Sequence, residues 1–226
     1  MKILMTGGSG LLGKEILKID SSIYYPTHKQ MDVKDINDIK HWVRYINPDT
    51  ILHLAANTDC QAHEHSPHLA MDNIIGSVNV AIACIDYNVR LVYTSTDYIY
   101  YGEGPHKETE AIFPPYNFAK GKLGGEMAVS LCPNSLILRL SFGRRPFPHQ
   151  RVYEGQYNSK LYVDEMAPLV LKAAKSSSVG IMNIGGQRNS LEQYARRSRP
   201  DIETIPCPAW VPKDTSLDIT RMESEL

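Results

Sequence analysis

The chain has 226 residues, 42% of them hydrophobic, and carries 24 basic against 25 acidic side chains. This predicts one sizeable core, and a net charge of -1 gives no electrostatic reason to expect a nucleic acid or a membrane surface as a partner. The apolar runs are strand-sized and the chain enters a strand at once, so we expect no membrane span and no signal peptide. Without a CxxC pair, the cysteines predict reduced thiols in a cytoplasmic protein: Cys60, Cys84, Cys132 and Cys207.

Short β-rich runs alternate with longer helical patterns along the chain. The segment 143–159 is rich in Arg, Pro and Gly, and we expect it to be irregular. The alternation predicts a parallel sheet covered on both faces, a doubly wound, Rossmann-type α/β fold. In chain order the pattern predicts a strand at 2–5, a helix at 11–19, a strand at 23–25, a helix at 36–46, a strand at 50–55, a helix at 70–87, and strands at 90–95, 135–140 and 180–184.

A glycine-rich turn, TGGSGLLG, follows the first predicted strand and opens the first predicted helix. Gly7, Gly10 and Gly13 have a GxxGxxG spacing, which lets a backbone approach a pyrophosphate. The helix N-terminus then offers unpaired N–H groups and the positive end of its dipole. This combination predicts a dinucleotide-binding turn.

The end of the second predicted strand selects between the two nicotinamide dinucleotides. The sequence IYYPTHKQMDV has His28 and Lys29 there, and no carboxylate before Asp32. Basic residues suit a 2′-phosphate, so the segment favours NADP(H), while NAD(H) stays open. Asp32 and Val33 are placed to meet the adenine.

The chain resembles the extended short-chain dehydrogenase/reductase superfamily, and within it the dTDP-4-dehydrorhamnose reductase group of nucleotide-sugar enzymes. The resemblance is spread over segments in the right order: TGGSGLLG, MDVKD, HLAANTDCQAHEHSPHLAMDN, STDYIYYGEGPHKETE, LRLSFG, LYVDEMA and VPKDTSLDITRMESEL. The third segment also crowds Cys60, His63, His65 and His68, but it fits the family's loop, so we expect no metal site.

The resemblance implies hydride transfer between a nicotinamide and C4 of a nucleotide-linked hexose, with a Tyr as proton donor and a Lys one helical turn later. It places Thr96 as the hydroxyl at the reacting oxygen, and it implies substrate contacts at Thr58, Thr96, Asp97 and Phe142. It also implies these cofactor contacts: Gly7, Ser9, Gly10, Leu11, Leu12, Gly13, His28, Asp32, Val33, Leu54, Ala55, Ala56, Thr94 and Lys122.

The catalytic Tyr departs from the family pattern, Pro-x-x-x-Tyr-x-x-x-Lys-Leu-x-Gly-Glu. Laid on this chain without gaps, the pattern puts the Lys at Lys122 and the Tyr at Phe118, which has no proton to give. Choosing Tyr116 and Lys120 instead keeps a Tyr, but it shifts the face of the helix beyond them by about 200°. We prefer Lys122 as the family Lys. In that case Tyr116 or Tyr98 replaces the missing Tyr as proton donor, or the protein turns its substrate over poorly.

A second departure is the short excursion between LRLSFG and LYVDEMA, which trims the substrate side of the chain. Arg144, Arg145 and Arg151 in this excursion are candidate diphosphate contacts. We expect a single NAD(P)-binding domain over 1–226, with substrate-lobe segments at about 141–162 and 185–226.

Three functions fit the sequence. The first is an NAD(P)H-dependent reductase of a nucleotide-linked 4-keto-6-deoxy sugar in deoxysugar or polysaccharide biosynthesis. The second is a nucleotide-sugar 4-epimerase. The third is a non-catalytic subunit that binds cofactor or nucleotide sugar, and Phe118 and the short segment between LRLSFG and LYVDEMA are the features that favour it. A helix-paired homodimer is the expectation at family level.

Overall fold

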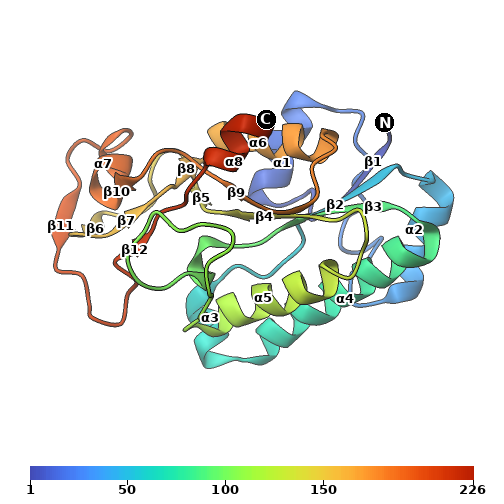
Figure 1. Cartoon of the computed structure of the whole chain (residues 1–226), viewed down its shortest axis with the longest axis horizontal. Coiled ribbons are helices and arrows are strands. Elements are labelled where there is room, and N and C mark those ends of the chain that lie inside the picture. The colour runs from blue at the N-terminus through green and yellow to red at the C-terminus, as the bar shows by residue number, and fades with distance from the viewer.

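A five-stranded parallel sheet lies between two layers of helices in the computed structural model, which describes residues 1–226 (Figure 1). The strand order is β1-β2-β3-β4-β9, and every neighbouring pair is parallel. Nearly all strand residues are buried, as expected where helices cover both faces of a parallel sheet. The strands are β1 (Ile3–Thr6), β2 (Thr50–His53), β3 (Arg90–Thr94), β4 (Leu136–Leu140) and β9 (Gly180–Ile184).

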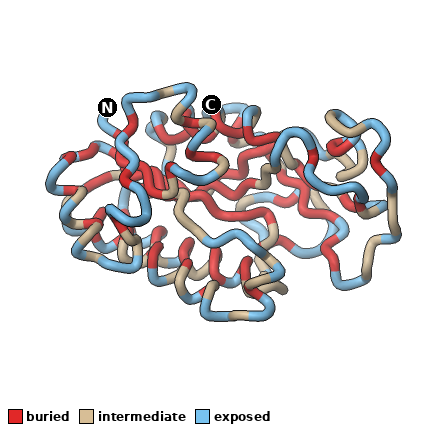
Figure 2. Tube along the Cα trace, turned by 180° about the vertical axis from the view of Figure 1, so that it is seen from behind, coloured by how far each residue is buried: buried red, intermediate tan, exposed pale blue.

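The helices divide between the two faces of the sheet (Figure 1). One layer holds α1 (Leu11–Ile19), α6 (Val163–Lys175) and the short C-terminal α8 (Thr220–Glu225). The other layer holds α2 (Ile36–Ile46), α4 (His68–Tyr87) and α5 (Asn117–Val129). Buried residues concentrate in the sheet and on the inner faces of these helices (Figure 2).

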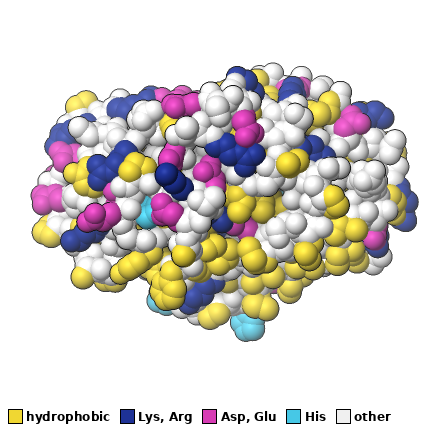
Figure 3. All heavy atoms as spheres, in the orientation of Figure 1, with side chains coloured by type: hydrophobic (Ala, Val, Ile, Leu, Met, Phe, Trp, Pro, Cys, Tyr) yellow, Lys and Arg dark blue, Asp and Glu magenta, His cyan; other side chains and the backbone are white.

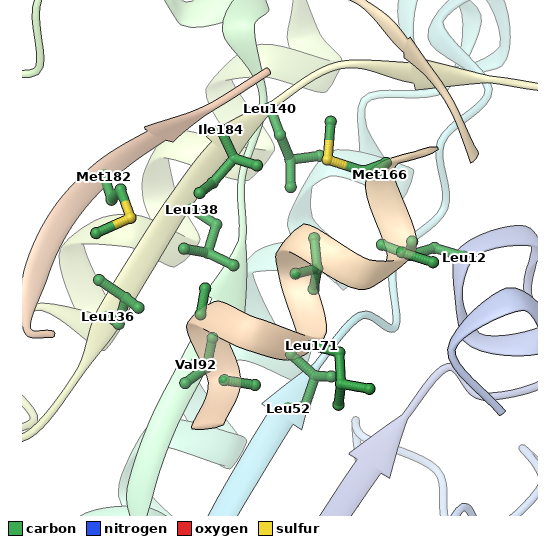
Figure 4. Packing of buried hydrophobic residues seen from close by; sticks show 14 of the residues in the cluster. Leu12, Leu52, Val92, Leu136, Leu138, Leu140, Met166, Leu171, Met182 and Ile184 are labelled. Atoms are coloured by element: carbon green, nitrogen blue, oxygen red, sulfur yellow. The ribbon is translucent and has the colours of Figure 1, made fainter. Parts of the chain in front are cut away.

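Each face of the sheet has its own apolar core. On the α6 face, Met166 and Leu171 pack with strand residues such as Leu138 (Figure 4). On the opposite face, Val43 of α2 and Val80 of α4 lie in a second buried cluster. Burial of such a side chain contributes about 1.5–3 kcal/mol, so these two clusters hold both helix layers against the sheet.

The predicted doubly wound fold is confirmed, and most predicted elements lie within two residues of their observed ends. The exception is 23–25, which forms only an isolated bridge between Tyr24 and Leu4. Tyr24 and Tyr25 are exposed, so this segment lacks the two-sided burial that fixes the other strands. It still lies beside β1 opposite β2, which makes the end of β1 the switch point of the sheet.

The segment 143–159, predicted to be irregular, instead contains two short strands, β6 (Arg151–Tyr153) and β7 (Tyr157–Asn158). Their partners lie far along the chain, so local periodicity gave no signal for them. The small sheets at this end of the molecule are completed by β5 (Phe142–Gly143), β8 (Leu161–Tyr162), β10 (Asn189–Ser190), β11 (Glu203–Ile205) and β12 (Asp214–Thr215). The remaining short helices are α3 (Cys60–His65), α7 (Leu191–Arg196) and the 3₁₀ turn η1 (Asp97–Ile99).

Helix α4 has 20 residues and a window of mean hydropathy 1.4, long and apolar enough to cross a membrane by length and composition. A single helix of this kind is weak support for a membrane span, because core helices meet the same criterion. In this fold α4 contributes Val80, Ala81, Ala83 and Cys84 to the core beneath the sheet.

Candidate active site

The glycine turn joins β1 to α1 at the switch point of the sheet. Gly7 has φ +70°, and a Cβ built on it would lie 2.7 Å from the backbone nitrogen of Ala55. A Cβ on Gly13 would lie 2.6 Å from the Cα of Gly8. The turn is therefore packed too closely for side chains at these positions. The N-terminus of α1 at Gly10 has no side-chain cap, so its free N–H groups can bind an anion.

A groove of about 420 Å³ lies beside this turn. Of the predicted cofactor residues it is lined by Gly7, Ser9, Gly10, His28, Asp32, Val33, Leu54, Ala55 and Ala56. The other five predicted cofactor residues do not line it: Leu12 and Gly13 are buried, Leu11 packs against the core, Thr94 donates a hydrogen bond to the His53 carbonyl at 3.4 Å, and Lys122 is buried on α5. The groove is otherwise lined by Lys34, Asn57, Leu69, Asp72, Asn73 and Gly76, which the sequence reasoning missed.

Asn73, one of these missed residues, is hydrogen-bonded through both polar atoms of its side chain. Its side chain accepts from the backbone nitrogen of Asn57 at 2.8 Å and donates to the Asn57 carbonyl at 2.9 Å. This pair fixes the loop after β2 against α4. The segment HLAANTDCQAHEHSPHLAMDN carried the signal for Asn73, but not for its partner, because the two residues are 16 positions apart.

At one end of the groove, Asp32 accepts a hydrogen bond from the backbone nitrogen of Lys34 at 2.9 Å. The Lys34 ammonium in turn pairs with Asp72 at 3.1 Å. His28 lines the groove, whereas Lys29 is exposed and lies outside the lining. Of the two basic residues predicted to select the cofactor, the structure thus brings only His28 to the groove.

Helix α5 carries the segment in which the family's Tyr and Lys lie. Phe118 and Lys122 share its buried face, with 8% and 4% of their surfaces exposed. Lys120 is exposed, with its ammonium near the Asn117 side chain at 3.5 Å. Tyr116 stands before the first turn of the helix as its N-cap. This arrangement follows from four-residue spacing, which keeps two side chains on one helix face.

The Lys122 ammonium lies 4.2 Å from the centre of the Tyr93 ring, a cation–π contact. Burial lowers the pKa of Lys122 to about 7, against the opposing influence of Glu126 one turn along the helix. Glu126 is fully buried and accepts from the guanidinium of Arg139 at 2.9 Å. This ion pair holds α5 against β4 and so fixes the position of Lys122 relative to the sheet.

The Phe118 ring packs edge-on against the imidazole of His63, with 5.4 Å between ring centroids. His63 is fully buried: Nδ1 lies 2.7 Å from the Asp59 carbonyl and Nε2 lies 3.2 Å from the Asn73 amide nitrogen. Nδ1 therefore donates and Nε2 accepts. The position that a catalytic phenol would occupy is an aromatic contact without a hydroxyl.

Thr96 and Asp97 follow β3 and are both buried. The Thr96 hydroxyl accepts from the backbone nitrogen of Tyr98 at 3.2 Å and lies 3.3 Å from Asp97 Oδ1, whose other oxygen accepts from Thr215 at 2.8 Å. Burial raises the pKa of the Asp97 carboxyl to about 6, although the Thr215 hydrogen bond and the charge of Lys160 oppose this. Thr215 lies 118 residues away, so only the fold reveals this contact.

A larger cavity of about 1100 Å³ lies between α3, the start of α5 and the small sheets. Several aromatic side chains contribute to its wall, including Tyr98, Tyr116, Tyr153 and Trp210, which suits the face of a sugar or a base. The Tyr116 hydroxyl donates to the Trp210 carbonyl. The other lining residues include Cys60, Glu64, Phe147, His149, Gln156, Lys160 and Tyr194.

None of the four predicted substrate residues lines this cavity: Thr58 is exposed, Phe142 packs against the core of the α6 face, and Thr96 and Asp97 are buried just after β3. Among the candidate diphosphate contacts only Arg151 lines it. Arg145 instead pairs with Asp164 at 3.2 Å and Glu165 at 2.9 Å, so it is not free to bind a diphosphate.

The chain is similar to known proteins over most of its length. The model of the RmlD substrate binding domain family matches residues 1–146. The dTDP-4-dehydrorhamnose reductase of Salmonella typhimurium is 32% identical over 170 residues, covering 70% of this chain and 54% of that enzyme. The methionine adenosyltransferase 2 subunit beta of Pongo abelii is 30% identical over 141 residues, covering 57% of this chain and 42% of that subunit.

A solved dTDP-4-dehydrorhamnose reductase from Bacillus anthracis, in complex with NADP, has a TM-score of 0.88. At 24% identity, over 99% of this chain and 92% of that one, it supports the fold. The chain spans about half the length of the curated relatives it matches. The family model covers well over half of the chain, and the resemblance inferred from the motifs is confirmed. The chain belongs to the RmlD substrate binding domain family.

Proposed function

We propose that this protein is an NAD(P)H-dependent reductase of a nucleotide-linked 4-keto-6-deoxy sugar in deoxysugar or polysaccharide biosynthesis. One observation carries the proposal. A dinucleotide-type groove at the glycine turn and an aromatic cavity of about 1100 Å³ occur in one fold whose Thr96 and Lys122 match the family's motifs. Relatives named dTDP-4-dehydrorhamnose reductase and a polysaccharide biosynthesis protein of Bacillus subtilis support the substrate class.

The residues of the groove fit a nicotinamide dinucleotide. Gly7 and Gly10 line the groove at the uncapped N-terminus of α1, where a pyrophosphate would bind, and Asp32 faces the place of the adenine. His28 lines the groove where a 2′-phosphate would lie, which favours NADP(H). Such a cofactor supplies the hydride when it is bound.

The remaining roles belong to side chains of this chain. Lys122 binds the ribose of the nicotinamide, Thr96 donates a hydrogen bond to the reacting oxygen, and Asp97 contacts the sugar. Segments 141–162 and 185–226 form the substrate lobe, since Lys160 and Tyr194 within them line the cavity. We also assign the protein to the cytoplasm.

The test is NADPH oxidation with a dTDP-4-keto-6-deoxy sugar, for the protein as it stands and for Phe118→Tyr. We expect one alcohol formed for each NADPH consumed. If both proteins bind NADPH, seen as quenching of intrinsic fluorescence, yet neither consumes it, the reductase proposal fails. Interconversion of a UDP-sugar without net cofactor oxidation would identify a 4-epimerase instead.

A second candidate function is a cofactor-binding subunit without turnover. The Phe118–His63 contact favours it, because the catalytic position has no proton donor. Relatives that are 30% identical to this chain are named methionine adenosyltransferase 2 subunit beta, that is, as a subunit of another enzyme. NADPH binding without oxidation, for this protein and for Phe118→Tyr alike, would favour this function.

We further propose a homodimer formed through α4 and α5. Apolar side chains gather along the outer face of these helices (Figure 3). They are exposed on this chain: Met71, Ile75, Ile82, Ile85 and Met127, with Leu131 just beyond α5. The apolar residues of this segment thus begin inside the fold at Ala119 and end on this surface at Met127 and Leu131, which a second copy of the chain would cover.

A further inference from the structure

Lys160 reaches the wall of the large cavity from the turn between β7 and β8. Its stem crosses Gly143, where an added Cβ would lie 3.2 Å from Lys160 Cε. No hydrogen bond or ion pair within the fold engages its ammonium, although thirteen other ion pairs hold charged groups of this chain. An unpaired ammonium in an aromatic cavity is available to a ligand.

The neighbours of Lys160 connect it to the predicted reaction centre. Burial lowers the pKa of its amine, while the charges of Asp97 and Cys60 act in the opposite direction. Asp97 lies 3.3 Å from the Thr96 hydroxyl, and Thr96 is the residue matched to the family's contact with the reacting oxygen. Lys160 therefore lies within charge–charge range of a group bonded directly to Thr96.

The other proton donors near Thr96 are less suited to the reaction. Phe118 has none, and the Tyr116 hydroxyl already donates to the Trp210 carbonyl. Burial and the Asp97 charge raise the pKa of the Tyr98 phenol above its usual range, which makes it a weaker acid. Lys122 faces the Tyr93 ring beneath α5.

We propose that Lys160 donates the proton to the keto oxygen of the substrate, in place of the phenol that Phe118 lacks. This inference rests on the proposed reductase function. A hydride forms the new C–H bond at the carbonyl carbon, and the electron pair of the C=O π bond moves to the oxygen. That oxygen takes a proton from the Lys160 ammonium, and the neutral amine regains one from water in the cavity.

The pH dependence of this step follows from the groups around Lys160. Asp97 of η1 and Cys60 of α3 face it, and the titratable residues that share its cavity are Glu64, Tyr98, Tyr116, His149, Arg151, Tyr153 and Tyr194. A donor must carry its proton, so turnover falls as the pH rises through the pKa of Lys160. Loss of a positioned acid lowers the rate by about 10²–10⁴-fold.

The first test needs neither cofactor nor turnover. Lysine acetylation of the folded protein is followed by mass spectrometry over a range of pH, with exposed Lys120 as the internal reference. We expect Lys160 to react with a midpoint at lower pH than Lys120, and a dTDP-sugar in the cavity to protect Lys160 alone. Equal midpoints, or no protection, overturn the inference.

The second test compares the parent, Lys160→Met, Phe118→Tyr and the double variant in NADPH oxidation. We expect Lys160→Met to lower kcat by at least about 10²-fold with little change in KM. Lys160→Arg should stay as slow, because a guanidinium keeps the charge but does not release its proton. The double variant should recover, because the phenol restored at Phe118 supplies the proton.

The outcomes separate the two proposals. If the parent reduces the sugar and Lys160→Met matches it, the Lys160 assignment falls while the reductase function stands. If only the Phe118→Tyr proteins are active, the Lys160 assignment falls as well, and the parent chain is not itself a reductase. If none of the four proteins consumes NADPH, the reductase function fails and the role of Lys160 in it fails as well.

Discussion

Phe118 and His63 form an edge-to-face aromatic pair that joins the buried face of α5 to the groove beside the glycine turn. His63 reaches Asn73, and Asn73 holds the loop at Asn57 that lines the groove. Helix α5 and the groove are therefore coupled through one buried imidazole. A substitution at His63 should therefore alter both the packing of α5 and the binding of a ligand in the groove.

We expect His63→Ala to weaken NADPH binding several-fold and to lower the free energy of unfolding by about 2–4 kcal/mol, because it leaves a cavity beside Phe118 and removes a partner of Asn73. Fluorescence quenching and urea unfolding measure the two effects. His65→Ala, an exposed change on the same short helix, is the matched control. Equal behaviour of the two variants would contradict this coupling.

Gly7→Ala should abolish NADPH binding, because the new Cβ would overlap the backbone at Ala55. Gly155→Ala is a close control: its φ is +64° against +70° for Gly7, but nothing lies within 4 Å of an added Cβ. In the control, the conformational strain alone should lower the free energy of unfolding, by about 1 kcal/mol, and the protein should bind NADPH normally. Calorimetric titration with NADPH distinguishes the variants, and loss of binding in both would refute the role of close packing.

In the absence of cofactor, the buried Lys122 side chain should lower the free energy of unfolding relative to an apolar side chain at this position. Its pKa in the fold is about 7, so between about pH 7 and pH 10 the unfolded chain holds a proton that the folded chain has released. The free energy of unfolding therefore rises with pH across this window, and the burial penalty is complete below it. We expect Lys122→Met to stabilise the protein near pH 6.5 by about 1–4 kcal/mol and to abolish turnover.

Urea unfolding at about pH 6.5 and pH 9.5 checks this, because the advantage of Lys122→Met should shrink at the higher pH. The control is Lys120→Met, an exposed change two residues earlier that should alter stability little at either pH. A stability gain that does not change with pH would argue against a depressed pKa.

Ile75→Glu should convert the proposed dimer to a monomer, because it places a charge in the middle of the apolar face of α4 and α5. Light scattering after gel filtration measures the mass. Tyr45→Glu, an exposed change on α2 away from this face, should leave the mass unchanged. A parent protein that is already monomeric at micromolar concentration would contradict the proposed interface.

The helices 11–19 and 36–46 and the strand 180–184 were predicted with the bounds that the structure shows, because apolar spacing and turn residues act locally. The segment 23–25 was wrong as a full strand: its residues favour a strand, but too few of them are covered on both faces. The strands within 143–159 were missed because their partners lie some fifty residues further on.

In the candidate site, too, some features could be predicted from the sequence and others could not. The motif register singled out Phe118 and Lys122 rather than Tyr116 and Lys120, and the buried face of α5 holds that preferred pair. Nothing in the linear order indicated Lys160 near Asp97, the Thr215 bond to Asp97, or His63 behind Phe118. The sequence by itself determined the fold class and the glycine turn, since both depend on neighbours within a few residues. Only the tertiary structure decided which charged groups face the cavity. Burial and contacts between distant residues set the pKa of each side chain, and they determine which of its hydrogen-bonding groups are left without a partner.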